Sequence, residues 1–152
     1  VGAVVVGFDH YISYPKITKA CTYLRNPDCL FIVTNDDRTF PGPDNIVCPG
    51  TGAVVAGVIQ GSGRTPKILG KPHRPMFNFL SRQLGHLDPE KTLMIGDRCQ
   101  TDIRFASEHK MNSLFVLSGV QSLKDIKQFE EEGKTNMVPD FYANSLADVM
   151  KL

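Results

Sequence analysis

The stretch LMIGDRCQTDI, residues 93–103, carries the strongest signal in the chain. An apolar run ends at Gly96, which permits a tight turn, and Asp97 follows directly. Asp102 stands where a helix is predicted to begin. Ligands of open α/β sheets bind beyond the carboxyl ends of strands, and two carboxylates there could hold a hard cation such as Mg²⁺. In the structural alternative, Asp97 is solvated and Asp102 stabilises a helix N-terminus.

A second polar group follows an apolar run in ILGKPHRPMF, residues 68–77. The predicted strand ends at Gly70, Lys71 comes next, and Pro72 restricts the backbone. A lysine held there could neutralise a phosphate and a nearby carboxylate. The alternative is a surface lysine in a proline-rich turn.

Short apolar runs alternate with helical periodicity along the whole chain, which predicts an α/β protein with mainly parallel sheets. The strand at 4–8 is continuously apolar and is expected to be buried on both faces. Residues 61–66, GSGRTP, form the clearest linker. The other predicted strands are 30–33, 46–47, 67–69, 92–95, 113–117 and 141–142, and the predicted helices follow Ser13, open at 49–60, and span 75–84, 101–109, 123–132 and 146–151.

Length and composition fit one ordinary domain or two small lobes, at 152 residues with a formal net charge of +1. Nothing global indicates a nucleic-acid or membrane partner, and no apolar run approaches the roughly 20 residues of a membrane helix. The four cysteines are scattered without zinc-ligand spacing, which favours free thiols in a reducing, cytoplasmic compartment. The chain starts at Val1 inside an apolar run, so we expect a fragment.

Taken together, GKPHRPMF and TLMIGDRCQTDI resemble motifs III and IV of the haloacid dehalogenase superfamily of phosphatases. The subgroup they resemble has a large α/β cap and includes phosphoglycolate, pyridoxal-phosphate and 4-nitrophenyl phosphatases. AVVVGFDHYISYPKI, FIVTNDDRTFP and CPGTGAVVAGV are similar to that cap, and MVPDFYANSLADV to the C-terminal end of the core. The resemblance implies most of a cap at 1–64 and the second half of a Rossmann-like core, a partial parallel sheet, at 65–152.

The resemblance also implies a role for each polar residue already singled out. Lys71 would be the catalytic lysine that holds the phosphate, Asp97 a Mg²⁺ ligand, and Asp102 a supporting acid outside the metal shell. The implied chemistry is phosphoryl transfer to an aspartate nucleophile, with a second aspartate as general acid and base.

That nucleophile is not found in this chain. Asp9 follows an apolar run, but Tyr11 and Ile12 replace the second acid and the glycine of the family's DxDGT motif. Asp9 is therefore expected to be a structural or loop-capping residue of the cap. Thr34 in FIVTNDD resembles the motif II hydroxyl, yet PGTGA follows it as in the family's cap, so motif II is also expected to be missing.

The loop at 36–41 is similar to the family's substrate-specificity loop, and Arg38 and Phe40 are the substrate-binding candidates beside Lys71. Arg38 could meet a substrate carboxylate with two hydrogen bonds. A histidine of the pyridoxal-phosphate branch aligns with Phe40, which weakens that substrate. The expected partners are a small phosphorylated metabolite, such as phosphoglycolate or 4-nitrophenyl phosphate, and a second copy bound through the cap. The alternative is a non-catalytic α/β module that binds a ligand or partner.

Overall fold

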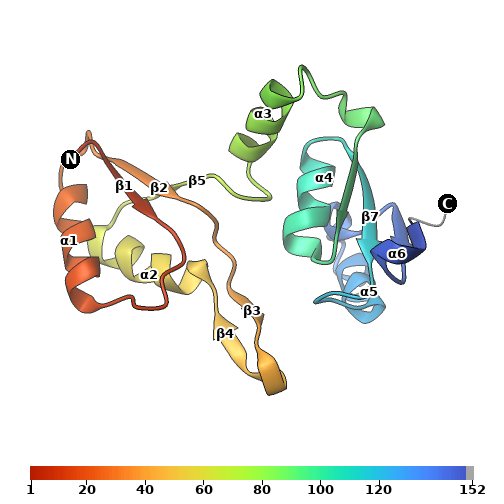
Figure 1. Ribbon diagram of the computed structural model, residues 1–152, viewed down its shortest axis with the longest axis horizontal. Helices are drawn as coiled ribbons and strands as arrows, with labels where there is room; N and C mark the ends of the chain where they lie inside the picture. The colour runs from red at the N-terminus through yellow and green to blue at the C-terminus, as the bar shows by residue number, and fades with distance from the viewer. Residues whose placement is uncertain (150–152) are drawn as a thin grey trace. The chain divides into compact units, whose positions relative to one another are not determined.

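The structure, a computed structural model, describes residues 1–149, apart from the side chain of Asn45. The chain divides into two compact units, of which the first is Val1–Gly70 and the second begins at Lys71 (Figure 1). The sequence placed a boundary after residue 64. The contacts divide the chain later because strand β5 (Lys67–Ile68) pairs with β2 (Leu30–Val33) of the first unit. The identity of the units as cap and half-core stays a prediction at this point.

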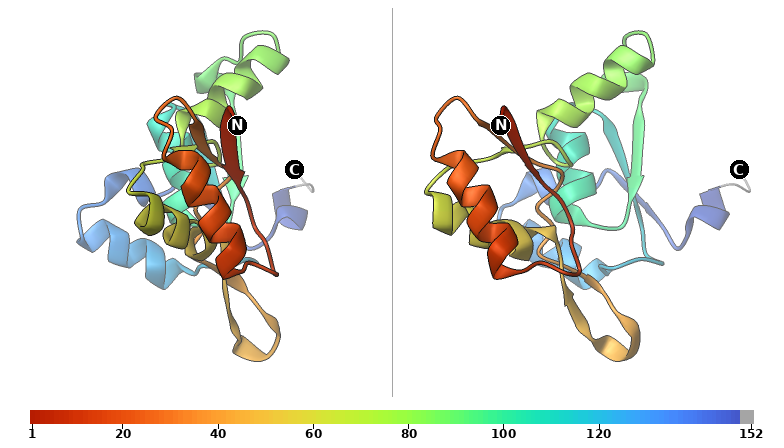
Figure 2. Two further views of the ribbon diagram at one scale, coloured as in Figure 1. Left: turned by 90° about the vertical axis from the view of Figure 1, so that its left-hand side faces the viewer. Right: turned by 60° about the vertical axis from the view of Figure 1, so that its left-hand side comes forward.

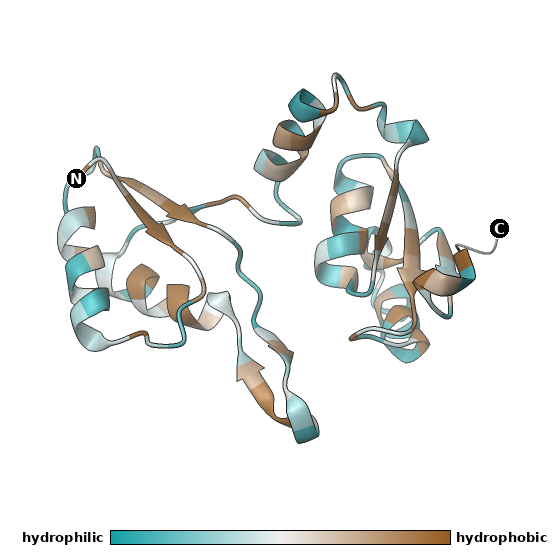
Figure 3. Ribbon diagram, viewed as in Figure 1, coloured by the Kyte–Doolittle hydropathy of each residue, from teal (hydrophilic) through white to brown (hydrophobic). Residues whose placement is uncertain are grey.

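The first unit is a three-stranded parallel sheet in the order β1-β2-β5, as the alternating pattern predicts. Val6, Phe31 and Val33 of the sheet form one buried core with Leu24 of the first helix and two valines of the second. Figure 3 shows the apolar colouring concentrated on these strands and on the second helix. Besides β2 and β5, the elements of this unit are β1 (Ala3–Val6), α1 (Tyr14–Leu24), β3 (Thr39–Pro41), β4 (Val47–Pro49) and α2 (Thr51–Ser62).

Strand β1 is buried on one face only, so the expectation of burial on both faces is wrong. Val6 points into the core, whereas Val5 is 62 % exposed. The reason is that both helices of the unit pack into one core on one side of the sheet. Its ends differ too, because β1 stops at Val6 rather than at Phe8.

The sequence also missed a β-hairpin. β3 and β4 pair antiparallel across a short 3₁₀ turn, Pro43–Asn45 (Figure 2). The predicted strand at 46–47 overlaps β4 only at Val47, where β4 begins, and its partner strand lies in a stretch rich in polar and turn-forming residues. Such a stretch lacks the apolar alternation that identifies a strand.

The predicted linker at 61–66 is packed against the first unit. Helix α2 continues to Ser62 and ends at Gly63, which adopts a left-handed conformation with φ 64°. The guanidinium of Arg64 then donates hydrogen bonds of 3.0 to 3.3 Å to four backbone carbonyls in and after α1, those of Leu24, Asn26, Pro27 and Cys29. One side chain therefore closes the C-terminal end of α1. The N-terminal end has no such closure, because Ser13 occupies the N-cap position without a side-chain hydrogen bond.

The second unit contains a parallel sheet in the order β6-β7-β8, with β6 at the edge among the described residues. Most of its buried apolar residues fall into two clusters, one around Phe115 and Ile103 and one around Phe105 and Met111. The elements are α3 (Arg74–Gln83), β6 (Leu93–Gly96), a π-helix (Cys99–Ile103), α4 (Arg104–Glu108), β7 (Asn112–Val116), α5 (Leu123–Glu131), β8 (Phe141–Ala143) and α6 (Leu146–Val149), with 3₁₀ turns at Pro89–Lys91 and Thr135–Met137.

Two helices of this unit differ from their predictions. The helix expected at 101–109 is a π-helical turn, Cys99–Ile103, followed by the short α4. The last helix was expected at 146–151; α6 begins at Leu146, and residues 150 and 151 of that prediction lie outside the described residues. Among the residues that the structure describes, none belongs to a helix long and apolar enough to cross a membrane.

The N-terminal cap of α5 is expected to make the stability of the second unit pH-dependent. The backbone N–H and the hydroxyl of Ser122 donate to Asp125 Oδ2 at 2.8 and 2.7 Å, and these bonds lower the pKa of Asp125 below its usual value. A carboxylate with a lowered folded-state pKa stabilises the fold above the unfolded-state pKa near 4, and loses this effect as pH falls through the folded-state pKa. We therefore expect Asp125→Asn to destabilise the unit at pH 6 by less than about 1 kcal/mol, because the cap is partly exposed to solvent, and by less still at pH 3.

This expectation is checked by hydrogen exchange of the α5 and β7 amides and by an NMR titration of the Asp125 carboxyl carbon. Glu130→Gln, on an exposed position of the same helix, is the matched control. An Asp125→Asn effect of equal size at both pH values would contradict the role given to the carboxylate.

Candidate active site

Lys71 and Asp102 are joined by an ion pair at the start of the second unit. Lys71 Nζ lies 2.6 Å from Asp102 Oδ1. Asp102 is 4 % exposed, and its Oδ2 accepts hydrogen bonds of 3.2 Å from the backbone N–H groups of Asp97 and Arg98. This carboxylate therefore holds both the lysine and the turn that follows β6.

Gly96 makes this approach possible. A Cβ atom at position 96 would lie 2.3 Å from Asp102 Cβ, which is far inside van der Waals contact. The glycine was predicted to permit a tight turn after the strand. In the structure its lack of a side chain leaves room for the buried aspartate.

Asp97 lies at the carboxyl end of β6, and its carboxylate is held by the loop that follows another strand, β7. Its Oδ2 accepts a hydrogen bond of 2.8 Å from the backbone N–H of Val120, in the loop after β7. Gly119 allows the contact, since a Cβ there would lie 2.1 Å from the same oxygen. In parallel sheets the carboxyl ends of neighbouring strands meet at one edge, which explains why the two loops touch.

The two aspartates have different surroundings and can do different chemistry. Asp102 is committed to Lys71 and to two backbone N–H groups, whereas Asp97 Oδ1 takes no hydrogen bond among the described residues. A free carboxylate oxygen at a strand end suits Mg²⁺, which binds one or two protein carboxylates and completes its shell with waters and substrate phosphate. Asp97 fits such an ion as one ligand. Within residues 1–149 no group of three or more His, Cys, Asp or Glu side chains could hold a metal by itself.

Cys99 lies beside this site but is shielded from reaction. Its side chain is fully buried, and burial, with smaller effects of Asp125 and Asp102, raises the pKa of the thiol to about 12. A protonated, buried thiol is a poor nucleophile and metal ligand. Cys99 therefore belongs to the core around Phe115.

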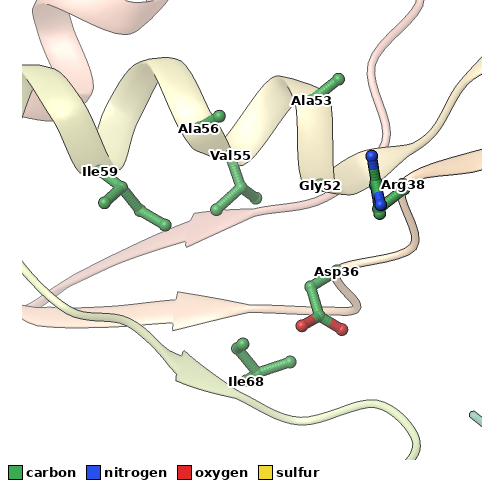
Figure 4. Close-up of a pocket in the computed structure, with 8 residues that line it drawn as sticks. All are labelled: Asp36, Arg38, Gly52, Ala53, Val55, Ala56, Ile59 and Ile68. Carbon is green, nitrogen blue, oxygen red and sulfur yellow. The ribbon is translucent and has the colours of Figure 1, made fainter. Parts of the chain in front are cut away.

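Arg38 lies in the first unit, on the loop before β3. It lines a pocket of about 400 Å³ together with Asp36, Gly52 and apolar side chains of α2, as Figure 4 shows. The loop sits close against the start of α2, because the N–H groups of Gly50 and Gly52 donate to the carbonyls of Arg38 and Asp37 at 2.8 and 2.9 Å. The Arg38 side chain is exposed. Its role toward a substrate stays a prediction.

Phe40 packs within the first unit. Its ring meets the ring of Phe8 edge-to-face, with the centroids 5.3 Å apart. Both rings line a second, mostly apolar pocket of about 460 Å³ between the β3–β4 hairpin and α2. Phe40 remains 38 % exposed, so part of the ring is available to a ligand.

Asp9 and Thr34, which the sequence did not assign to the active site, both bond to residues close by in the chain. Asp9 accepts a hydrogen bond of 2.8 Å from Tyr11 N and forms a 2.6 Å ion pair with Lys16. The bond from Lys16, followed by that from Tyr11 N, lowers the pKa of Asp9. Asp9 therefore caps its own loop. The hydroxyl of Thr34 donates a hydrogen bond of 2.9 Å to Asn35 Oδ1.

The family of this chain is identified by a match that covers most of the second unit. A family model described as HAD-hydrolase-like matches residues 68–149, which is more than half of the chain. The chain belongs to this HAD-like hydrolase family.

Several relatives of this HAD-like chain are named as phosphatases. It is 44 % identical over 153 aligned residues to a glycerol-3-phosphate phosphatase of Rattus norvegicus, covering 99 % of this chain and 47 % of the relative. The p-nitrophenyl phosphatase of Archaeoglobus fulgidus superposes with a TM-score of 0.85 at 30 % identity, over 99 % of this chain and 56 % of that one. A glycerol phosphate phosphatase of Mycobacterium tuberculosis, solved in complex with magnesium, gives a TM-score of 0.80 at 27 % identity, over 96 % and 42 %. The HAD-like chain thus spans about half the length of the curated relatives it matches.

Sequence reasoning singled out three charged residues that lie together in the structure, and their role in a site stays a prediction. It missed the groups that hold them. The resemblance to motifs III and IV pointed to Lys71, Asp97 and Asp102, and the structure brings all three together. The supporting loop, residues 119–121, was not singled out. A signal was present, because a glycine, Gly119, comes shortly after an apolar strand, as Gly96 ends one.

Proposed function

We propose that this chain forms part of a Mg²⁺-dependent phosphatase that hydrolyses small-molecule phosphate monoesters. In this proposal the chain supplies most of the cap and the second half of the core. The aspartate that attacks phosphorus lies outside residues 1–152. The observation that carries the proposal is the ion pair of Lys71 with the buried Asp102, next to an Asp97 carboxylate that keeps one oxygen for a cation.

The chemistry proposed for this site requires a cation and an anchored carboxylate at the phosphate. Asp102 orients Lys71. The Lys71 ammonium donates hydrogen bonds to the non-bridging phosphate oxygens and offsets the negative charge that accumulates on them. Asp97 would hold Mg²⁺, which when bound screens the repulsion between the phosphate and the carboxylates. The attacking carboxylate takes the phosphoryl group and expels the alcohol, and water then releases inorganic phosphate from the aspartyl-phosphate.

The substrate class rests on the first unit. Arg38 carries a positive charge on the loop before β3, and Phe40 offers an apolar ring. An arginine favours a substrate with a second acidic group, as in phosphoglycolate, whereas a ring favours an aryl ester such as 4-nitrophenyl phosphate. The relative with 44 % identity is named for glycerol 3-phosphate, so this compound joins the panel of substrates to test.

Two further parts of the proposal concern the setting of the protein. We expect self-association through the cap, where the hairpin leaves Ile46 and Val47 exposed. The four cysteines are all free, which supports a reducing compartment such as the cytoplasm.

The decisive experiment is a chimera in which this chain replaces the matching segment of rat glycerol-3-phosphate phosphatase. We expect Mg²⁺-dependent phosphate release from the chimera, and a loss of at least about a hundredfold in kcat for Lys71→Met and for Asp97→Asn. Lys91→Met, whose ion pair with Asp88 is exposed, is the matched control and should leave the rate unchanged. A folded chimera that releases no phosphate would count against the proposal.

The chain alone tests where the nucleophile lies. We expect the purified 152-residue chain and its Asp9→Asn variant to be equally inactive on 4-nitrophenyl phosphate and 2-phosphoglycolate. Turnover that disappears in Asp9→Asn would make Asp9 the nucleophile and refute the cap assignment.

A further inference from the structure

The loop after β7 is tied to the turn after β6 at three points. Val120 N donates to Asp97 Oδ2 at 2.8 Å, and Gln121 N donates to the Asp97 carbonyl at 3.3 Å. The side chain of Gln121 then reaches across, and its Oε1 accepts a hydrogen bond of 2.6 Å from Cys99 N. These contacts hold the backbone of residues 97–99 against the loop after β7.

The third contact answers a specific need of the backbone. Cys99 is the first residue of the π-helix, where N–H groups lack partners inside the helix. Its side chain is fully buried, so an unpaired N–H there would be costly. Gln121 meets this need from another part of the chain.

We infer that Gln121 is a positioning residue for the Asp97 carboxylate. The inference rests on the proposed function in one respect, namely that Asp97 binds Mg²⁺. The Gln121 amide fixes its own loop to Cys99, and the neighbouring Val120 N–H fixes the direction in which Asp97 Oδ1 faces a cation. Gly119 adds to this fit, because any side chain there would displace the carboxylate.

The expected loss of Mg²⁺ affinity is modest, because the Gln121 side chain does not contact the Asp97 carboxylate itself. Groups that hydrogen-bond a metal ligand typically change metal affinity by about 10- to 100-fold when removed. Gln121 acts one contact further out, through the loop backbone, so we expect its loss to weaken Mg²⁺ binding by about fivefold.

The test uses the ¹⁵N-labelled 152-residue chain with MgCl₂ as the probe. Gln121→Met keeps the length of the side chain and removes the acceptor, whereas Gln121→Glu keeps an acceptor for Cys99 N–H. Gln128→Met is the matched control, since Gln128 bonds Glu132 on the exposed face of α5. The readouts are the Mg²⁺ dissociation constant from amide shifts of residues 96–99, and the hydrogen-exchange rates of the Val120 and Cys99 amides.

We expect Gln121→Met to weaken Mg²⁺ binding about fivefold and to speed exchange at Val120 and Cys99 ahead of the β7 amides. Gln121→Glu should restore slow exchange at Cys99, and Gln128→Met should resemble the wild type. An unchanged Mg²⁺ dissociation constant in Gln121→Met, or faster exchange spread evenly over the second unit, would overturn the inference. A wild-type chain without any response to Mg²⁺ would refute the metal role of Asp97 instead, and the Val120 and Cys99 exchange rates would still decide whether Gln121 holds the loop.

Discussion

Replacing Lys71 by methionine is expected to lower the unfolding free energy of the second unit by about 2 to 3 kcal/mol. Among residues 1–149, the ammonium group is the one side-chain partner of the Asp102 carboxylate, which is almost fully buried. Breaking a buried pair leaves an uncompensated charge, which costs more than the pair itself contributes. The partial exposure of Lys71, at 38 %, puts the expected value below the roughly 3 to 5 kcal/mol typical of fully buried pairs.

The measurement is native-state hydrogen exchange at the β7 amides, which reports the second unit without the first. Lys91→Met is the control, because its partner Asp88 is half exposed and such pairs contribute less than about 1 kcal/mol. The double variant Lys71→Met/Asp102→Asn should recover more than half of the loss, since it removes the stranded charge. Equal effects of Lys71→Met and Lys91→Met would show that the buried pair contributes nothing special.

The second large effect is expected for Gly96→Ala, at about 3 kcal/mol of lost stability in the same unit. The added methyl would lie 2.3 Å from Asp102 Cβ and 2.5 Å from its Oδ2. Asp102 is buried and holds both Lys71 and the turn, so it has no low-energy way to move aside. The strand end and the ion pair should therefore be disturbed together.

Gly133→Ala separates this steric effect from an effect of backbone conformation. Gly133 has φ 70° but open space around it, so alanine there should cost only about 1 kcal/mol. Chemical shifts of Lys71 Nζ in the Gly96→Ala chain should also move toward those of a solvated lysine. A Gly96→Ala chain as stable as Gly133→Ala would mean that the turn accommodates the methyl without displacing Asp102.

The parts of the fold that the sequence predicted are those with a strong local signal. Strand β2 is a continuous apolar run and β7 ends in one at residues 114–116, and the structure has both strands close to their predicted bounds. The start of α2 followed from its glycine-rich opening. The hairpin was missed because its strands lie in a polar, proline-containing stretch, and strand pairing supplies a stability that no local pattern records.

The candidate site likewise has parts that the sequence predicted and parts that it did not. Lys71, Asp97 and Asp102 follow apolar runs or open a helix, so their places at the sheet edge could be anticipated from chain order. The ion pair of Lys71 with Asp102, and the hold of Val120 and Gln121 on Asp97 and Cys99, join residues about 20 to 30 positions apart. Contacts of that kind depend on which strands become neighbours. The π-helix was invisible for another reason, because its wider turn disrupts the 3.6-residue period on which helix prediction relies.

That wide turn makes chain length more critical than residue type between Asp97 and Asp102. Deleting a single residue between Asp97 and Asp102 would change which side chains of the π-helix and of α4 face Lys71 and the two buried clusters, because these helices are continuous. Ile103 and Phe105, both now buried, would leave their places in two different clusters at once. An in-frame loss of one codon here should therefore be tolerated less well than most substitutions, and natural relatives should keep the spacing between their two acids even where the intervening letters differ.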